Sequence, residues 1–312
     1  MSDSPSSTAS VPRAGSITGE VVEYQAGGAT LRGYLVQNES VSGPRPGVLV
    51  VHEWWGHNEY ARRRARMLAE LGYTALAVDM YGDGQQAAHP EDAMRFVAAV
   101  EEKAEVGEAR FDAAMQLLQA HPNVDATRIA AIGYCFGGGI IMHMARRGRS
   151  LAGVAAFHGG IEAGREPLVP GAIKGKVAIF HGEADPFVPA EAVLAFRKEM
   201  ADAGVDLRFY SYPGVKHSFT NPEATALGER FGLPLVYDAD ADQRSWEAAV
   251  AFLDEVLGSA ARKPEQPRLN PSSAAIPSED PRELANAVIA RPANRRVEDQ
   301  SGQQIILNSN GM

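Results

Sequence analysis

The chain has 312 residues, of which 45% are hydrophobic and 22% charged, and its formal net charge is −9 at pH 7. Because binding to phosphates requires clustered Lys and Arg, this acidic balance argues against nucleic acid and anionic membranes as partners. The single cysteine allows no intrachain disulfide, and no apolar run approaches the ~18 residues of a membrane span, so we expect a cytoplasmic protein.

The chain begins with a segment rich in Ser and Pro. Residues 1–17 contain no apolar core, which predicts a flexible leader rather than a secretory signal. Two short β-prone runs follow at residues 21–24 and 30–36. The Gly27-Gly28 pair between these runs predicts an antiparallel hairpin.

From residue 47 onward, apolar runs typical of strands alternate with amphipathic segments. The continuously apolar run at the start of this region is typical of a strand buried on both faces. Strands are predicted at residues 47–52, 74–78, 128–133, 151–157, 176–181 and 206–212. Helices are predicted at 58–72, 90–100, around 111–118, at 136–148 and 189–204, and finally over 246–257. This alternation predicts an α/β fold with a mostly parallel, doubly wound sheet and helices on both faces, whose ligands bind at the carboxyl ends of the strands.

The end of the chain has a different composition. Residues 261–312 are rich in Pro, Ser and Asn, which predicts a largely disordered tail beside a domain of residues 18–260. Within this tail, residues 278–290 can form a short helix and residues 303–307 a short strand. The alternative is a segment that docks on the domain or on a second subunit. The sequence carries no signal for an oligomeric state.

The sharpest motif lies between the strand at 128–133 and the helix that follows it. Residues 133–137 read Gly-Tyr-Cys-Phe-Gly, the pattern of the strand-to-helix elbow of α/β-hydrolases with Cys135 as nucleophile. The flanking glycines allow the tight turn, and the helix N-terminus favours a thiolate. The Phe136 amide can then bind a developing oxyanion. A lone cysteine is more often a small buried hydrophobe, but this context favours the catalytic interpretation.

A nucleophilic thiol needs a base, and the base needs a group that orients it. In the α/β-hydrolase fold these follow the nucleophile in the order acid, then histidine. Asp185 and His217 each lie in a loop just after a predicted strand. Glu183 is the competing acid, but we prefer Asp185 because the acid loop must extend to reach the imidazole. The alternatives are a turn residue for Asp185 and a surface histidine for His217.

Together these motifs resemble the dienelactone hydrolase family. The resemblance covers roughly residues 21–257 and is carried by His52-Glu53-Trp54-Trp55-Gly56, Asp79-Met80-Tyr81, residues 133–138, His181-Gly182 with Asp185-Pro186, and His217-Ser218-Phe219. It implies a triad of Cys135, His217 and Asp185, no cofactor, and hydrolysis of a small-molecule carboxylic ester or lactone through an acyl-thioester.

The resemblance also suggests a role for Glu53. A carboxylate near a thiol disfavours the thiolate, so Glu53 can keep Cys135 neutral until substrate displaces it. The Trp54 amide is the expected second oxyanion donor, and Glu53 can alternatively be a solvated loop acid. The aromatic side chains expected to line the substrate pocket, each of which can equally be ordinary core, are Trp54, Trp55, Tyr81 and Phe219.

The sequence departs from the family at the positions that hold an anionic substrate. Family members that act on dienelactone place arginines in the loop after Asp-x-Tyr and just after His-Ser-Phe. Here these positions read Gly82-Asp83-Gly84 and Thr220-Asn221-Pro222. This difference favours a neutral or differently anchored ester over an anionic lactone.

Two other functions compete with this interpretation. His52-Glu53 and His57 resemble the H-E-x-x-H motif of metal hydrolases, but the spacing is one residue too long and Gly56 weakens a helix there, so we expect no metal. His158 and His181 end apolar strands, which favours hydrogen-bonded core histidines over ligands. The second alternative is a binding or redox-sensing module that keeps the fold without the reaction.

Overall fold

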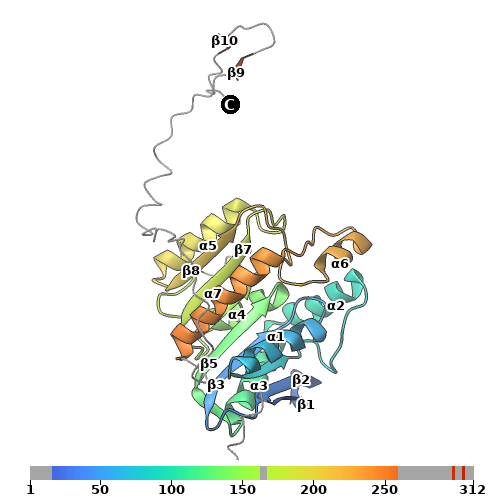
Figure 1. Cartoon of the computed structure of the whole chain (residues 1–312), viewed down its shortest axis with the longest axis vertical. Helices are drawn as coiled ribbons and strands as arrows, with labels where there is room; N and C mark the ends of the chain where they lie inside the picture. The colour runs from blue at the N-terminus through green and yellow to red at the C-terminus, as the bar shows by residue number, and fades with distance from the viewer. Residues whose placement is uncertain (1–15, 162–166, 259–296, 299–303, 306–312) are drawn as a thin grey trace, which may run out of the picture. The chain divides into compact units, whose positions relative to one another are not determined.

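The computed structural model describes residues 16–161, 167–258, 297–298 and 304–305 (Figure 1). The chain divides into two compact units, residues 1–263 and 264–312. In the second unit, β9 (Val297–Glu298) and β10 (Gln304–Ile305) pair antiparallel, and β10 lies inside the strand predicted at 303–307. The rest of the tail, including its predicted helix, and residues 1–15 of the leader lie outside the described residues, so those predictions remain predictions.

The first unit contains eight strands and seven helices within its described residues. The strands are β1 (Ile17–Ala26), β2 (Ala29–Asn38), β3 (Arg45–Val51), β4 (Thr74–Val78), β5 (Val124–Tyr134), β6 (Gly153–Phe157), β7 (Lys176–Gly182) and β8 (Leu207–Tyr212). The helices are α1 (Glu59–Glu70), α2 (Pro90–Glu101), α3 (Ala104–Ala120), α4 (Phe136–Arg146), α5 (Ala190–Asp202), α6 (Ala224–Phe231) and α7 (Ala239–Leu257).

The eight strands form one sheet in the order β1-β2-β4-β3-β5-β6-β7-β8. The hairpin of β1 and β2 is antiparallel, and β2 also pairs antiparallel with β4, whereas all the pairs from β4 to β8 are parallel. This confirms the predicted architecture. Since β3 to β8 run in one direction, the loops at their carboxyl ends meet at one edge of the sheet.

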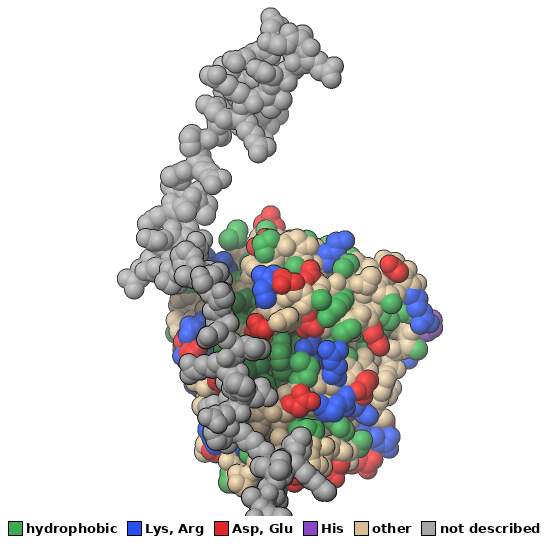
Figure 2. Space-filling model, viewed as in Figure 1, with side chains coloured by type: hydrophobic (Ala, Val, Ile, Leu, Met, Phe, Trp, Pro, Cys, Tyr) green, Lys and Arg blue, Asp and Glu red, His purple; other side chains and the backbone are tan. Residues whose placement is uncertain are grey.

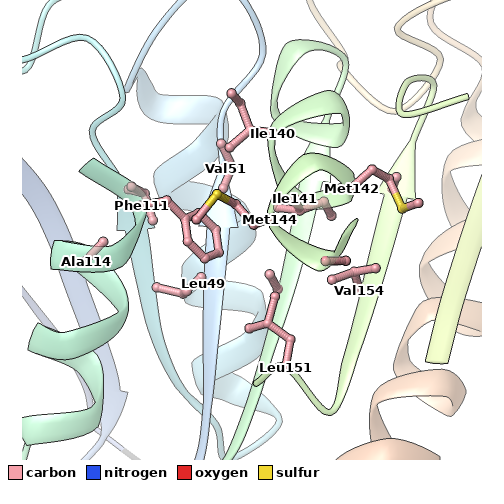
Figure 3. Close-up of a cluster of buried hydrophobic side chains, with 14 of the residues drawn as sticks. Leu49, Val51, Phe111, Ala114, Ile140, Ile141, Met142, Met144, Leu151 and Val154 are labelled. Atoms are coloured by element: carbon pink, nitrogen blue, oxygen red, sulfur yellow. The ribbon is translucent and has the colours of Figure 1, made fainter. Parts of the chain in front are cut away.

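Two hydrophobic layers cover the faces of this sheet. Along β3, Leu49 and Val51 join the layer formed with α2, α3, α4 and α5, while Val48 and Val50 join the layer formed with α1 and α7. Figure 3 shows the first layer, where Phe111 of α3 and Ile141 of α4 pack over β3. Burying each such side chain contributes about 1.5–3 kcal/mol, so the core holds the strand ends in place.

The structure differs from the sequence prediction mainly in the lengths of elements. Both hairpin strands are longer than predicted, and β5 begins at Val124, where it pairs with Arg45 of β3. Helix α7 begins seven residues before Trp246, because the side chain of Asp238 caps its first turn. Helix α6 was not predicted; it is eight residues long and lies beside α2 in Figure 1.

Charges of both signs are mixed on the molecular face drawn in Figure 2, with Lys and Arg beside Asp and Glu. Exposed ion pairs in the described residues include Lys198 with Asp202 on α5. In the part of the chain that the structure describes, no helix is long and apolar enough to cross a bilayer.

Candidate active site

Cys135 occupies a sharp bend between β5 and α4. Its backbone has φ 52° and ψ −116°, a conformation that residues with a Cβ rarely adopt. A Cβ at Gly133 would lie 2.2 Å from the carbonyl oxygen of Gly137, and one at Gly137 would lie 2.3 Å from that of Val51. Both positions therefore require glycine, which is the physical reason for the pattern seen in the sequence.

Backbone strain concentrates at this edge of the sheet. The described non-glycine residues with positive φ are Asp83, Cys135, His158 and Ser218, and they follow β4, β5, β6 and β8. Strained backbone persists where the surrounding structure holds it, and it clusters at functional sites. The loops at the carboxyl ends of the strands are therefore the candidate site.

Two amide groups near Cys135 have no partner among the described residues. The Cys135 amide donates to Phe157 O (3.0 Å), and the Gly137 amide to His52 O (3.1 Å). The amides of Phe136 and Trp54, in contrast, form no hydrogen bond to another described residue. These are the two amides that the sequence identified as oxyanion donors, and they are available for one.

His217 and Asp185 are in direct contact. The imidazole Nδ1 donates a hydrogen bond to Asp185 Oδ2 at 2.6 Å, and both side chains are buried. Glu183, the competing acid, is exposed and accepts a hydrogen bond from the Ser211 hydroxyl instead. The geometry therefore agrees with the choice of Asp185.

The pKa of His217 reflects this contact and a second one to Cys135. Burial lowers the pKa, but the negative charge of a Cys135 thiolate and hydrogen bonds to Asp185 and Cys135 raise it to about 10. The imidazole is thus hydrogen-bonded to Asp185 through Nδ1, and Cys135 lies close enough to raise its pKa. This arrangement favours the protonated, positively charged form of the imidazole.

Two aromatic rings pack edge-on against the His217 imidazole. The His158 ring centroid lies 5.3 Å away and the Phe187 centroid 5.0 Å away, with interplanar angles of 66° and 84°. His158 is fully buried, and its Nε2 forms a 2.8 Å hydrogen bond with Thr220 Oγ1, which confirms its prediction as a core histidine. The sequence analysis did not single out Phe187, although its position two residues after Asp185 was a usable signal.

Glu53 is buried and bound to the loop that carries His217. Ser218 Oγ donates to Glu53 Oε1 (2.9 Å) and Asn221 Nδ2 donates to Oε2 (2.6 Å). Burial raises the pKa of Glu53, and these two hydrogen bonds lower it again in part. The carboxylate is therefore not a solvated loop acid. Its partners, Ser218 and Asn221, could have been suspected from their place beside His217.

The Trp54 loop is fixed by Tyr81. The Tyr81 hydroxyl donates to the carbonyl oxygen of Trp54 (2.9 Å), and burial together with the charge of Cys135 raises the pKa of this phenol. Asp79 holds the chain around Tyr81 because its carboxylate accepts hydrogen bonds from the Tyr81, Gly82 and Gly84 amides. Tyr81 and Trp54 are thus both brought to the site.

The other two aromatic residues expected in the pocket lie in packed clusters. Trp55 is buried with Ala224 and Leu235, and its ring stacks on Phe231 of α6 at 5.8 Å. Phe219 is fully buried between Tyr212 and His158. Both side chains therefore pack beneath the loops of the site and stabilise them.

The two histidines of the metal-like motif have other surroundings. His52 Nδ1 donates to the Glu53 carbonyl oxygen (2.6 Å) and its Nε2 accepts from the Met80 amide (3.3 Å), so both nitrogens are occupied. His57 is buried, and burial lowers its pKa to about 3. In the described part of the chain, no group of three His, Cys, Asp or Glu side chains is placed to hold a metal ion.

The two positions where arginines would hold an anionic substrate are occupied differently. Asp83 donates its amide to Thr30 O (2.7 Å), and Asn221 binds Glu53. Arg64 does contact the second loop, but it is buried and paired with Asp242. Its charge is therefore already neutralised within the fold.

Comparison with known proteins gives a consistent picture. The model of the family described as "Dienelactone hydrolase family" matches residues 31–257. The chain is 36% identical to a dienelactone hydrolase-like promiscuous phosphotriesterase from metagenomic libraries. The crystal structure of that protein superposes on this one with a TM-score of 0.71, and the match covers 78% of this chain and 100% of that chain. It is 27% identical to an Aquifex aeolicus (strain VF5) protein named "Putative carboxymethylenebutenolidase", over 77% of this chain and 99% of that protein.

Proposed function

This chain belongs to the dienelactone hydrolase family, and we propose that it hydrolyses small carboxylic esters or lactones by way of a Cys135–His217–Asp185 triad and an acyl-thioester. The observation that carries the proposal is the placement of one imidazole between two partners. His217 Nδ1 is held by Asp185 at 2.6 Å, and Cys135 at the strained elbow raises the pKa of the same ring. This is the arrangement of nucleophile, base and orienting acid that acyl transfer requires.

In the first step, the Cys135 thiolate attacks the carbonyl carbon of the ester and forms a C–S bond. The amides of Phe136 and Trp54 hold the negative oxygen that develops, because they have no other partner among the described residues. The tetrahedral intermediate then collapses, and the bond from carbon to the alcohol oxygen breaks. His217 donates its proton to that oxygen, and the alcohol leaves.

In the second step, water replaces the alcohol beside His217. The imidazole takes a proton from the water as it attacks the thioester carbon, the C–S bond breaks, and the acid leaves. Asp185 keeps Nδ1 protonated throughout, which fixes the tautomer that presents Nε2 to the reacting atoms. The thiolate and imidazolium are then restored.

Glu53 is proposed to restrain the thiol before substrate binds. Its side chain is buried and held by Ser218 and Asn221 in the His217 loop. In its ionised form, Glu53 disfavours a second negative charge on Cys135. We expect Glu53→Gln to speed the alkylation of Cys135 by iodoacetamide. An unchanged alkylation rate would contradict this role.

The proposed substrate is neutral. Neither of the two loops that face a substrate carboxylate in dienelactone-cleaving relatives offers a free arginine, since Arg64 is paired with Asp242 and bound to the Thr220 carbonyl oxygen. An anionic lactone would therefore enter the site without a compensating charge. Burying an unpaired charge costs free energy, and uncharged short-chain esters and lactones avoid this cost.

Turnover of acetate esters by the wild type and by Cys135→Ala tests the proposal. We expect the variant to lose activity while it keeps its fold by circular dichroism. Equal rates would instead support a binding module. Treatment with a chelator separates the metal alternative, because the proposed reaction survives chelation and is lost on alkylation of Cys135.

One observation favours a second substrate class. A phosphotriester is also neutral, and the relative at 36% identity is named a promiscuous phosphotriesterase. In such a reaction the Cys135 thiolate would form an S–P bond as the P–O bond to the leaving group breaks, and water would later cleave the S–P bond. Release of an aryl alcohol from an aryl dialkyl phosphate by the wild type, but not by Cys135→Ala, would support it.

A further inference from the structure

Phe187 is a large aromatic side chain exposed to solvent directly at the candidate site. It lies in the loop between β7 and α5 and is 55% exposed. The other large hydrophobic side chains exposed in the described residues are aliphatic: Val21, Met94, Val169 and Leu194. The Phe187 ring packs edge-on against the His217 imidazole with centroids 5.0 Å apart. An exposed phenyl ring at this place is a surface that an apolar ligand group can cover.

The backbone holds this residue in place independently of its side chain. The Phe187 amide donates to Asp185 Oδ1 (2.9 Å), and the Val188 amide donates to the Asp185 carbonyl oxygen (3.3 Å). The same carboxylate binds His217 through its other oxygen. The loop thus fixes the acid, the imidazole and the phenyl ring relative to one another, and a change of the Phe187 side chain leaves the hydrogen bond to Asp185 intact.

The position of the ring determines which part of a substrate it contacts. Because Nδ1 of His217 is occupied by Asp185, the proton for the leaving oxygen must come from Nε2. The group attached to that oxygen then extends past the imidazole. One ring neighbour of His217 is His158, which is fully buried, and the other is Phe187, which is open to solvent. Of these two neighbours, only Phe187 is open to solvent, so we expect the substituent to extend toward it.

On the basis of the proposed hydrolysis, we infer that Phe187 is a specificity-determining residue that binds the alcohol part of the ester. The substrate class that fits is an ester of an apolar, preferably aromatic, alcohol. The acyl substituent is bonded to the carbonyl carbon on the side away from the leaving oxygen, and it does not meet this ring. Preference should therefore depend on the alcohol and not on the acid.

The experiment compares two short series of uncharged esters with the wild type and Phe187→Ala. The first series varies the alcohol, with methyl, benzyl and cyclohexylmethyl acetate, whose alcohols have similar acidity. The second varies the acid, with methyl acetate and methyl phenylacetate. We expect kcat/KM for benzyl acetate to fall roughly two- to tenfold, the contribution of one aromatic contact. Rates for methyl acetate and methyl phenylacetate should change by a smaller factor that is the same for both, and inhibition by benzyl alcohol should weaken.

Matched variants separate this role from a general effect on the imidazole. Phe187→Leu should restore the rate for cyclohexylmethyl acetate more than that for benzyl acetate, and Val21→Ala, an exposed apolar residue on the far edge strand β1, should change neither series. An equal loss for methyl and benzyl acetate, or an unchanged ratio of the two, would overturn the inference about Phe187. A Cys135→Ala variant that still cleaves these esters would instead overturn the proposed hydrolysis itself.

Discussion

Arg64 donates a hydrogen bond from Nη2 to the carbonyl oxygen of Thr220 at 2.7 Å, although 156 residues separate the two. Arg64 is almost fully buried and forms an ion pair with Asp242. The Thr220 hydroxyl contacts Tyr60 Oη (2.6 Å) and His158 Nε2 (2.8 Å). The loop that carries His217 is therefore anchored to α1, α7 and the end of β6 at the same point.

Loss of this anchor should destabilise the protein. Arg64→Met leaves Asp242 as a buried carboxylate without its cation, which costs about 3–5 kcal/mol of unfolding free energy. Urea unfolding of the variant measures this loss. In the double variant with Asp242→Leu, the loss should be clearly smaller than the sum of the two single losses. Additive losses would show that the two residues act independently.

Glycine at position 133 should be essential for the elbow. A Cβ there meets the backbone of Gly137 at 2.2 Å, so Gly133→Ala must shift α4 relative to β5 and should lower both stability and activity. We expect a loss of about 1–3 kcal/mol, the usual cost of overpacking. Gly139→Ala is the matched control, since nothing lies within 4 Å of its Cβ. Equal behaviour of the two variants would contradict this account of the turn.

Burial of Glu53 should reduce stability at neutral pH. Its folded-state pKa is raised above 4.5 by burial, so the stability it contributes is present below pH 4.5 and is lost as the pH rises through the folded value. Glu53→Gln should therefore melt at a higher temperature than the wild type at neutral pH, and the difference should shrink on acidification. A lower melting temperature at neutral pH would mean that the bonds to Ser218 and Asn221 outweigh burial.

His57 should make the fold sensitive to acid. Burial, together with the charges of His52 and Arg62, lowers its pKa from 6.5 to about 3. A depressed histidine pKa contributes stability that is present above pH 6.5 and lost as the pH falls toward 3. His57→Leu removes one buried titrating group, so its unfolding free energy should depend less steeply on pH in this window. Parallel pH profiles for wild type and variant would exclude the effect.

The sequence predicted those parts of the site that depend on local pattern. The glycines around Cys135 indicate a turn that only glycine can flank, and the alternation of strands and helices indicates which loops share an edge. The expected reach of the acid loop favoured Asp185 over Glu183, and in the structure His217 contacts Asp185 while Glu183 binds Ser211. Each of these signals lies within a few residues of the chain.

Contacts between distant segments could not be predicted in this way. The bond between Arg64 and Thr220 and the packing of Trp55 on α6 depend on how the layers come together. Helix α6 is too short to give a clear periodic pattern, and it was therefore missed. Phe187 gave no periodic signal, because the role proposed for it follows from the exposure of one side chain in a loop.

The most direct test of the central claim is mass spectrometry of the enzyme quenched during turnover of a slowly hydrolysed ester. The account predicts a mass increase equal to one acyl group, located on the peptide that contains Cys135 and absent from Cys135→Ala. An Asp185→Asn variant should accumulate the same adduct more slowly. Continued turnover with no acyl group on Cys135, or with the adduct on another residue, would contradict the claim that this thiol is the nucleophile.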